Sequence, residues 1–161
     1  MLTDTMPLTG HYEASPVEFV RNQVEQFERS DGLEVNTMQD LPMIVLTTRG
    51  SRTGNLRLSP LMRVEHDGNY LIVASPGGTL SHPVWYQNVV ANPTVEIRDG
   101  ATRQDMAARE LTGAEREAWW RRAVAAHPPY ADYQRSAGRV IPILLCEPAG
   151  ADRAEPARRA G

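Results

Sequence analysis

Apolar residues follow two different spacings along this chain, and each spacing predicts a different kind of element. Val17, Val20, Val24 and Phe27 recur at helical spacing and predict a helix over residues 15–30. Further helices are expected at Pro83–Ala91, from Thr112 to about Ala126 and, as a short helical turn, at Tyr130–Ala137. The first and third helices open on capping boxes, Ser15-Pro-Val-Glu18 and Thr112-Gly-Ala-Glu115.

Runs of apolar and β-branched residues bounded by turn residues predict strands. His66-Asp-Gly-Asn69 and Asp99-Gly100 are typical hairpin turns, and Pro60 places its strand at an edge or a bulge. The strands are expected at Met43–Thr48, Leu56–Glu65, Tyr70–Ser75, Thr94–Arg98, Thr102–Glu110 and Val140–Cys146, with residues 33–41 as a connector.

The order of these elements predicts an α+β fold that is mainly antiparallel β. Hairpins join most of the strands, and the absence of a regular strand–helix alternation argues against a doubly wound sheet. With six strands, closure into a small barrel would remove exposed edges. We expect one domain at residues 15–148, a flexible N-terminus at 1–14 and a disordered tail rich in Ala, Arg, Gly and Pro at 149–161.

Composition narrows the classes of function. The net charge of −3 argues against a general nucleic-acid binder. All 17 basic residues are arginine, so contacts to anions fall to Arg, His or backbone amides. The single cysteine, Cys146, lies in an apolar run and is expected to be a buried hydrophobe. With no signal peptide and no long apolar run, we expect a cytoplasmic protein, while peripheral contact with a membrane stays open.

The most distinctive stretch is Arg49-Gly-Ser-Arg-Thr-Gly-Asn-Leu-Arg57, which we call the arginine turn. It joins two predicted strands and holds two glycines, two hydroxyls and three arginines. Glycines let a turn point its amides inward, and arginine adds a fork of donors that suits phosphate or carboxylate. The turn therefore predicts an anion site, although the same composition suits a solvated hairpin with surface arginines.

Two further segments combine chemistry-bearing residues. The loop Ala74-Ser-Pro-Gly-Gly78 allows close backbone approach, and Trp85 and Tyr86 follow it with flat apolar area and polar tips. Tyr130 and Tyr133 are three residues apart, so a helical turn places them on one face. These aromatic residues could line a pocket or simply pack the core.

Other common kinds of site have no support in the sequence. The four histidines are scattered, with no cysteine pair beside them, which argues against a metal site. The patterns Gly-x-Ser-x-Gly and Gly-x-Gly-x-x-Gly are absent.

Taken in order, these pieces resemble the deazaflavin-dependent nitroreductase family, whose members use coenzyme F420. The resemblance covers roughly residues 42–148. It rests on Leu46–Gly54, Arg57, Ser59–Leu61, Ala74–Ser75, Gly77–Gly78, Pro83, Trp85–Tyr86, Asn88, Ala91–Pro93, Tyr130, Asp132–Tyr133, Arg139, Ile141–Ile143 and Cys146–Pro148.

The resemblance implies a six-stranded split β-barrel of the FMN-binding type, with flanking helices and a deazaflavin in its groove. The arginine turn would then bind the phosphate and the oligoglutamate tail of F420, and FMN is the less favoured cofactor. Tyr130 and Tyr133 match substrate-side tyrosines, and Ser75 matches a serine near the reactive ring. The implied cofactor-binding residues are Ser51, Arg52, Thr53, Gly54, Arg57, Pro60, Met62, Ala74, Ser75, Pro76, Gly77, Gly78, Trp85, Tyr86 and Asn88.

The chain also departs from the family at four positions. Ser51 and Pro76 stand where basic residues are common in the family, which predicts a weaker hold on the anionic tail, a shorter tail or another cofactor. Met62 replaces an aromatic residue of the nitroreductase, and His127 replaces a tyrosine there.

The leading hypothesis is a reductase, monomeric or homodimeric, that passes hydride from reduced F420 to a quinone, an enone or a nitro compound. The alternatives are a carrier of F420 or flavin without turnover, and a small-ligand barrel whose arginine turn is only surface. The N-terminal helix is acidic, so a lid or a packing helix suits it better than a membrane contact.

Overall fold

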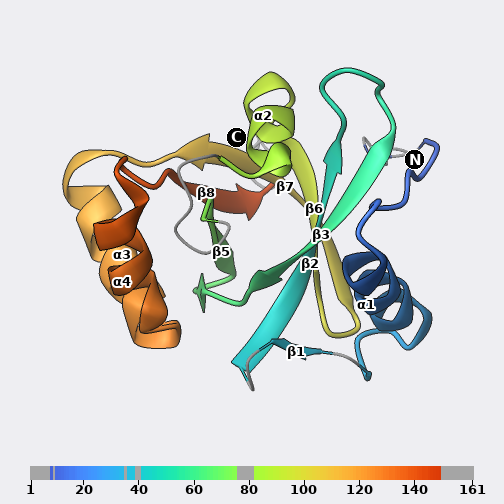
Figure 1. Ribbon diagram of the computed structural model, residues 1–161, viewed down its shortest axis with the longest axis horizontal. Coiled ribbons are helices and arrows are strands. Elements are labelled where there is room, and N and C mark those ends of the chain that lie inside the picture. The colour runs from blue at the N-terminus through green and yellow to red at the C-terminus, as the bar shows by residue number, and fades with distance from the viewer. Residues whose placement is uncertain (1–7, 9, 35, 39–40, 76–81, 150–161) are drawn as a thin grey trace, which may run out of the picture.

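The computed structural model describes residues 8, 10–34, 36–38, 41–75 and 82–149, and Figure 1 shows a twisted antiparallel sheet flanked by helices. The sheet has eight strands: β1 (Thr37–Met38), β2 (Leu41–Arg49), β3 (Leu56–Met62), β4 (Glu65–His66), β5 (Asn69–Val73), β6 (Thr94–Asp99), β7 (Thr102–Glu110) and β8 (Ile143–Pro148). The helices of this part of the chain are α1 (Glu18–Arg29), α2 (Val84–Ala91), α3 (Gly113–Ala126) and α4 (Pro129–Ala137). The mainly antiparallel α+β class that the sequence predicts is confirmed.

The strand order does not bear out the predicted six-stranded split β-barrel. The strands are hydrogen-bonded in the order β1-β2-β6-β7-β8-β5-β4. Of the strands in the described part of the chain, β3 lies off this path and pairs with β2 alone. Among the described residues, no ladder joins β3 to β4 or β5, so the sheet stays open there. Two extra strands arise because the predicted strand at 56–65 breaks after Met62, and because β1 lies inside the predicted connector. Strands of two residues are too short to leave an apolar pattern.

Side-chain alternation along β2 separates two layers of core. Ile44 and Leu46 pack with Trp85 of α2, whereas Met43 and Val45 pack with Val24 and Phe27 of α1. The helices α1 and α2 therefore cover opposite faces of this strand.

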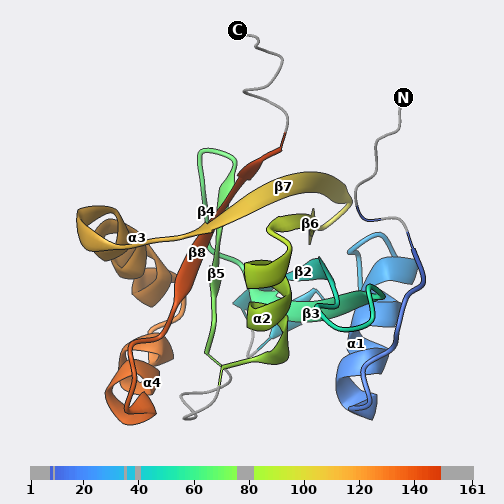
Figure 2. The same ribbon diagram turned by 90° about the horizontal axis from the view of Figure 1, so that it is seen from above.

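The same alternation in β5 places the third helical layer. Tyr70 and Ile72 belong to the core beneath α2, while Leu71 and Val73 pack with α3 and α4. Figure 2 shows the result, with α2 over the middle of the sheet and with α1 and the α3–α4 pair at opposite ends. None of the helices in the described part of the chain combines the length and apolar character needed to cross a bilayer.

Several local predictions can be checked against these elements. The hairpin at residues 66–69 is confirmed, with Asp67 and Gly68 at φ of 55° and 82°, as a tight turn requires. Both capping boxes are wrong: α1 begins at Glu18 after Val17, and neither helix has a side-chain cap hydrogen bond. Ser15 Oγ instead accepts from Val17 N at 3.1 Å.

Candidate functional site

The arginine turn is a tight loop closed by its own backbone. Gly50 N donates to Asn55 O at 2.7 Å, and Gly54 N donates to Gly50 O at 3.0 Å. Arg49 Nη1 adds a bond to Gly54 O at 2.9 Å. Gly54 has a φ of 76°, and a side chain on Gly50 would lie 3.0 Å from Thr53 Oγ1. The positive φ therefore favours glycine at position 54, and the close approach of Thr53 disfavours a side chain at position 50.

The side chain of Asn88 in α2 links the arginine turn to the end of β2 through two hydrogen bonds. Its Oδ1 accepts from Ser51 N at 2.9 Å, and its Nδ2 donates to Thr48 Oγ1 at 3.1 Å. The side chain is buried, so these bonds form where water cannot replace them. The predicted residues Ser51 and Asn88 are thus in direct contact, although 37 positions separate them.

The outer half of the turn presents donors to solvent. Ser51, Arg52 and Thr53 are exposed. Within the part of the chain that the structure describes, the amides of Arg52 and Thr53 have no hydrogen-bond acceptor, and the Arg52 side chain forms no ion pair. Consecutive unpaired amides next to a guanidinium are donors that suit a phosphate or a carboxylate.

Arg57 has a partner that the sequence did not reveal. Its Nη1 lies 3.3 Å from Glu13 Oε2, and Glu13 Oε1 accepts from Asn55 Nδ2 at 3.2 Å. Residues 11–13 lie along the start of β3, where Glu13 N donates to Leu56 O at 2.8 Å. The contact spans 44 positions in the sequence, so no local pattern could indicate it.

A cleft of about 240 Å³ opens beside the arginine turn, between the start of α1, β3 and α2. It unites three predicted cofactor-binding residues, Arg57, Trp85 and Asn88. Trp85 is 6% exposed and belongs to the core as well, so its packing and pocket interpretations both hold. Tyr86 turns elsewhere: its hydroxyl donates to Glu110 Oε1 of β7 at 2.8 Å.

The predicted loop after β5 is only partly described. Ala74 is fully buried, and its amide donates to Pro142 O at 2.9 Å. Arg139 Nη2 lies 3.4 Å from Ala74 O, so the end of β5 sits beside the segment that follows α4. Ser75 is half-buried there. The predicted residues Pro76, Gly77 and Gly78 lie outside the described residues.

The two tyrosines of α4 belong to an aromatic cluster at the far end of β3. His127 packs against both, with ring centroids 4.7 Å from Tyr130 and 5.9 Å from Tyr133. Met62, the last residue of β3, and Tyr130 are buried in the same apolar cluster, against which Tyr133 packs. The structure thus brings Met62 together with the tyrosines, and places Pro60 on the strand that leads to them.

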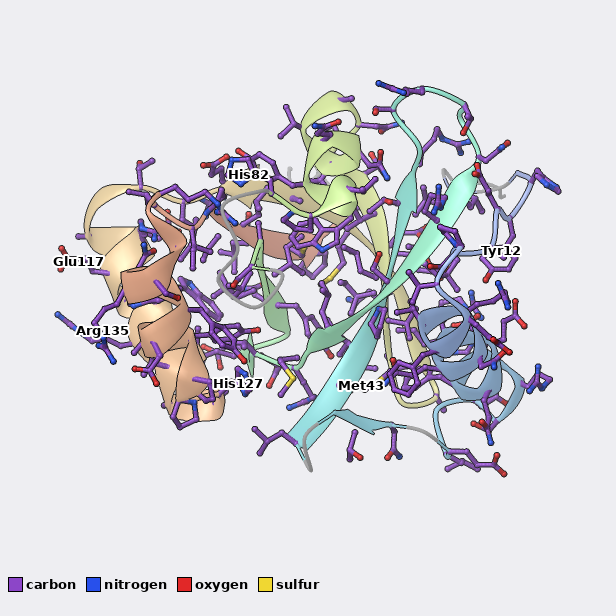
Figure 3. The ribbon with its side chains drawn as sticks, viewed as in Figure 1. Tyr12, Met43, His82, Glu117, His127 and Arg135 are labelled. Carbon is purple, nitrogen blue, oxygen red and sulfur yellow. The ribbon has the colours of Figure 1, made fainter. Side chains whose placement is uncertain are left out.

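Burial changes the proton chemistry of this cluster. It raises the pKa of the Tyr130 phenol above its ordinary value, and nearby Tyr133 adds to the shift. It lowers the pKa of His127, whose Nδ1 is buried without a hydrogen-bond partner in the described residues. His127 lies on the side of α4 that faces the sheet (Figure 3). The cluster therefore offers neutral donors in an apolar setting.

A larger cavity, of about 400 Å³, lies beneath α1. None of the residues that the sequence predicts for the site lines it, and its polar lining is mainly acidic, with Glu25, Glu28 and Glu96 beside Arg29 and Arg103. An anionic ligand fits this lining less well than it fits the arginine turn. The larger cavity therefore lies beneath α1, whereas the residues that suit an anion lie at the arginine turn. For an anionic ligand, we take the charge of the lining as the better guide.

The comparisons with known proteins agree on one family. The family model for F420H(2)-dependent quinone reductases matches residues 19–148. F420H(2)-dependent quinone reductase Rv1261c of Mycobacterium tuberculosis is 33% identical over 65% of this chain and 72% of its own length. Rv3178 of the same species, named for the same activity, is 30% identical over 67% of this chain and 91% of its own.

Solved structures extend the likeness to the fold. The F420-H2 dependent reductase FDR-A is 52% identical and has a TM-score of 0.63, over 66% of this chain and 94% of that chain. A domain-swapped dimer is 48% identical with a TM-score of 0.66, over 83% of this chain and all of the other. The predicted dependence on coenzyme F420 is confirmed, and the chain belongs to the F420H(2)-dependent quinone reductase family.

Proposed function

We propose that this chain transfers hydride from reduced F420 to a quinone, and that the cofactor lies along β3. The observation that carries the proposal is the course of this strand. It leaves the arginine turn at Leu56 and enters the aromatic cluster at Met62, about 20 Å away for a strand of this length. A long cofactor with a charged tail at one end and a flat ring at the other suits such a course.

The residues of the arginine turn fit the anionic end of F420. Arg52, with the amides of Arg52 and Thr53, would hold the phosphate and the first carboxylates of the tail, and Arg57 would add a second guanidinium. Asn88 holds the turn in shape through Ser51. Ser51 itself offers only a hydroxyl, so the arginines carry most of the attraction.

The far end would hold the ring and the acceptor. Reduced F420 supplies the hydride, so the protein has to orient the two partners and keep water away. Tyr130 and Tyr133 supply hydroxyl donors at this end, and Ser75 would join them from the end of β5. Their role would be to stabilise the negative charge that develops on the acceptor oxygen. The phenol of Tyr130 is protonated at neutral pH, as an ordinary tyrosine is, and burial raises its pKa further, so it can act as a neutral donor.

The test is anaerobic mixing of the purified protein with reduced F420 and menadione, followed by the return of oxidised F420 absorbance. We expect catalysed oxidation with F420 and far less with reduced FMN. An enone and a nitro-heterocycle, tested in parallel, rank the acceptor classes. Tight binding of F420 without oxidation by any acceptor would favour a carrier, and binding of neither cofactor would exclude both roles.

We further propose that the chain forms a homodimer, because a structure 48% identical to it is a domain-swapped dimer. Light scattering during size-exclusion chromatography measures the mass directly. A mass near twice 17.9 kDa is expected, and a monomer at micromolar concentration would contradict the proposal.

A further inference from the structure

Residues 11–13 attach to the edge of β3 just where the arginine turn ends. Leu56 N donates to His11 O at 2.7 Å, Glu13 N donates to Leu56 O at 2.8 Å, and Tyr12 forms a bridge with Leu56. The position of Tyr12 beside β3 is seen in Figure 3. These backbone contacts hold the backbone of residues 11–13 beside the arginine turn, whatever side chain stands at position 13.

At that place Glu13 acts as a carboxylate ligand of the site. One oxygen lies 3.3 Å from Arg57 Nη1, and the other accepts from Asn55 Nδ2 at 3.2 Å. The carboxylates of an oligoglutamate tail carry the same group and would seek the same donors. Glu13 and a tail placed at the arginine turn would therefore compete for Arg57.

The pairing of Arg57 with Glu13 would affect affinity for an anionic tail because the turn has few exposed cations. With Arg57 paired to Glu13, Arg52 is the exposed cation of the turn without an ion pair in the described part of the chain. The side chains of Arg57 and Glu13 are 26% and 40% exposed, so the pair is accessible to an entering ligand. A pair of this exposure contributes up to about 1 kcal/mol, which corresponds to about a fivefold change in an equilibrium constant.

We infer that Glu13 is a specificity-determining residue of the cofactor site, an internal carboxylate that weakens the hold on the anionic tail of F420 and leaves the hold on its ring unchanged. The inference rests on the proposed placement of the tail at the arginine turn. It assigns the contact a role in ligand selection rather than in stability alone.

The experiment compares Glu13→Gln with the wild type and with Glu18→Gln, which removes the same charge from the exposed first turn of α1. Dissociation constants are measured by fluorescence titration for oligoglutamyl F420 and for its deazaflavin riboside, which lacks phosphate and tail. We expect Glu13→Gln to bind F420 about fivefold more tightly and to bind the riboside as the wild type does. Glu18→Gln should change neither constant by more than about twofold.

Each result has one meaning. Unchanged or weaker binding of F420 by Glu13→Gln, or an equal change for the riboside, would overturn the inference. Repeating Glu13→Gln in an Arg57→Gln background should abolish the gain, and a gain that persists there would also overturn it. If the wild type binds the riboside and F420 equally well, the phosphate and tail contribute nothing to affinity. That result would contradict the proposed placement of the cofactor itself, before any role of Glu13 is considered.

Discussion

At one end of β3, the arginine turn exposes amides and guanidinium groups to water; at the other, Met62 enters a cluster where His127 and Tyr130 are almost fully buried. Hydrogen bonds hold the first region in shape, and ring contacts hold the second. An exposed cationic site can capture a charged tail quickly, whereas a dry site strengthens the dipoles that act on a reacting oxygen. In the function that we propose, affinity for the cofactor resides mainly at the arginine turn and turnover at the aromatic cluster.

The largest expected effect comes from removing both arginines of the turn. Arg52→Ala with Arg57→Ala deletes two charge-assisted contacts of about 1.5–3 kcal/mol each, so F420 binding should weaken more than about a hundredfold. Fluorescence titration measures the loss. The matched control is Arg121→Ala with Arg135→Ala, two exposed arginines of α3 and α4. An equal loss in the control would mean that only overall charge matters.

Tyr133→Phe tests the other end of the strand. Removing one well-placed donor typically costs on the order of a hundredfold or more in rate, so turnover should fall while the dissociation constant of F420 changes little. Stopped-flow oxidation of bound reduced F420 measures turnover apart from binding. Tyr12→Phe serves as the control, because its hydroxyl donates to Glu25 beneath α1. Equal losses of affinity and rate in Tyr133→Phe would refute the assigned role.

Asn88→Ala should affect the shape of the arginine turn more than its charge. The change leaves Ser51 N and Thr48 Oγ1 without their partner, which costs about 1–3 kcal/mol of stability. F420 affinity should fall by about tenfold, since the turn must then be ordered on binding. Chemical denaturation and titration measure the two losses. Unchanged affinity in a destabilised variant would show that Asn88 serves the fold alone.

The smallest effect concerns pH. Because burial lowers the pKa of His127, the unfolded chain binds a proton more readily than the folded one below a pH of about 6.5. Stability should therefore fall as the pH drops from 7.5 to 5, and His127→Phe should reduce that fall. Urea denaturation across this range checks the prediction. Parallel curves for the two proteins would mean that His127 does not contribute.

The parts of the fold that were predictable depend on local chemistry. The turn at residues 66–69 requires positive φ at two adjacent positions, which Asp67 and Gly68 adopt. The local sequence of the turn was therefore enough to predict the hairpin. The bounds of β7 were predicted correctly because local signals mark both of its ends. The turn at Asp99-Gly100 precedes the strand, and the helix start at Thr112 follows it. The strand β8 begins at Ile143 rather than Val140, because Pro142 lacks the amide that a ladder needs.

The candidate site was predictable only in its composition. Glycines, arginines and hydroxyls marked the arginine turn, and Arg52 and Thr53 lie exposed in it. The contacts that complete the site, from Ser51 to Asn88 and from Arg57 to Glu13, join segments 37 and 44 positions apart. Such contacts depend on which segments the folded sheet brings side by side. The spacing of residues along the sequence does not predict them.

The most direct test of the account is a crystal structure of the protein with F420 bound. We expect the phosphate and tail within hydrogen-bond distance of Arg52 and the amides of the arginine turn, and the ring beside Met62 and Tyr133. A cofactor in the larger cavity beneath α1, among Glu25, Glu28 and Glu96, would contradict it.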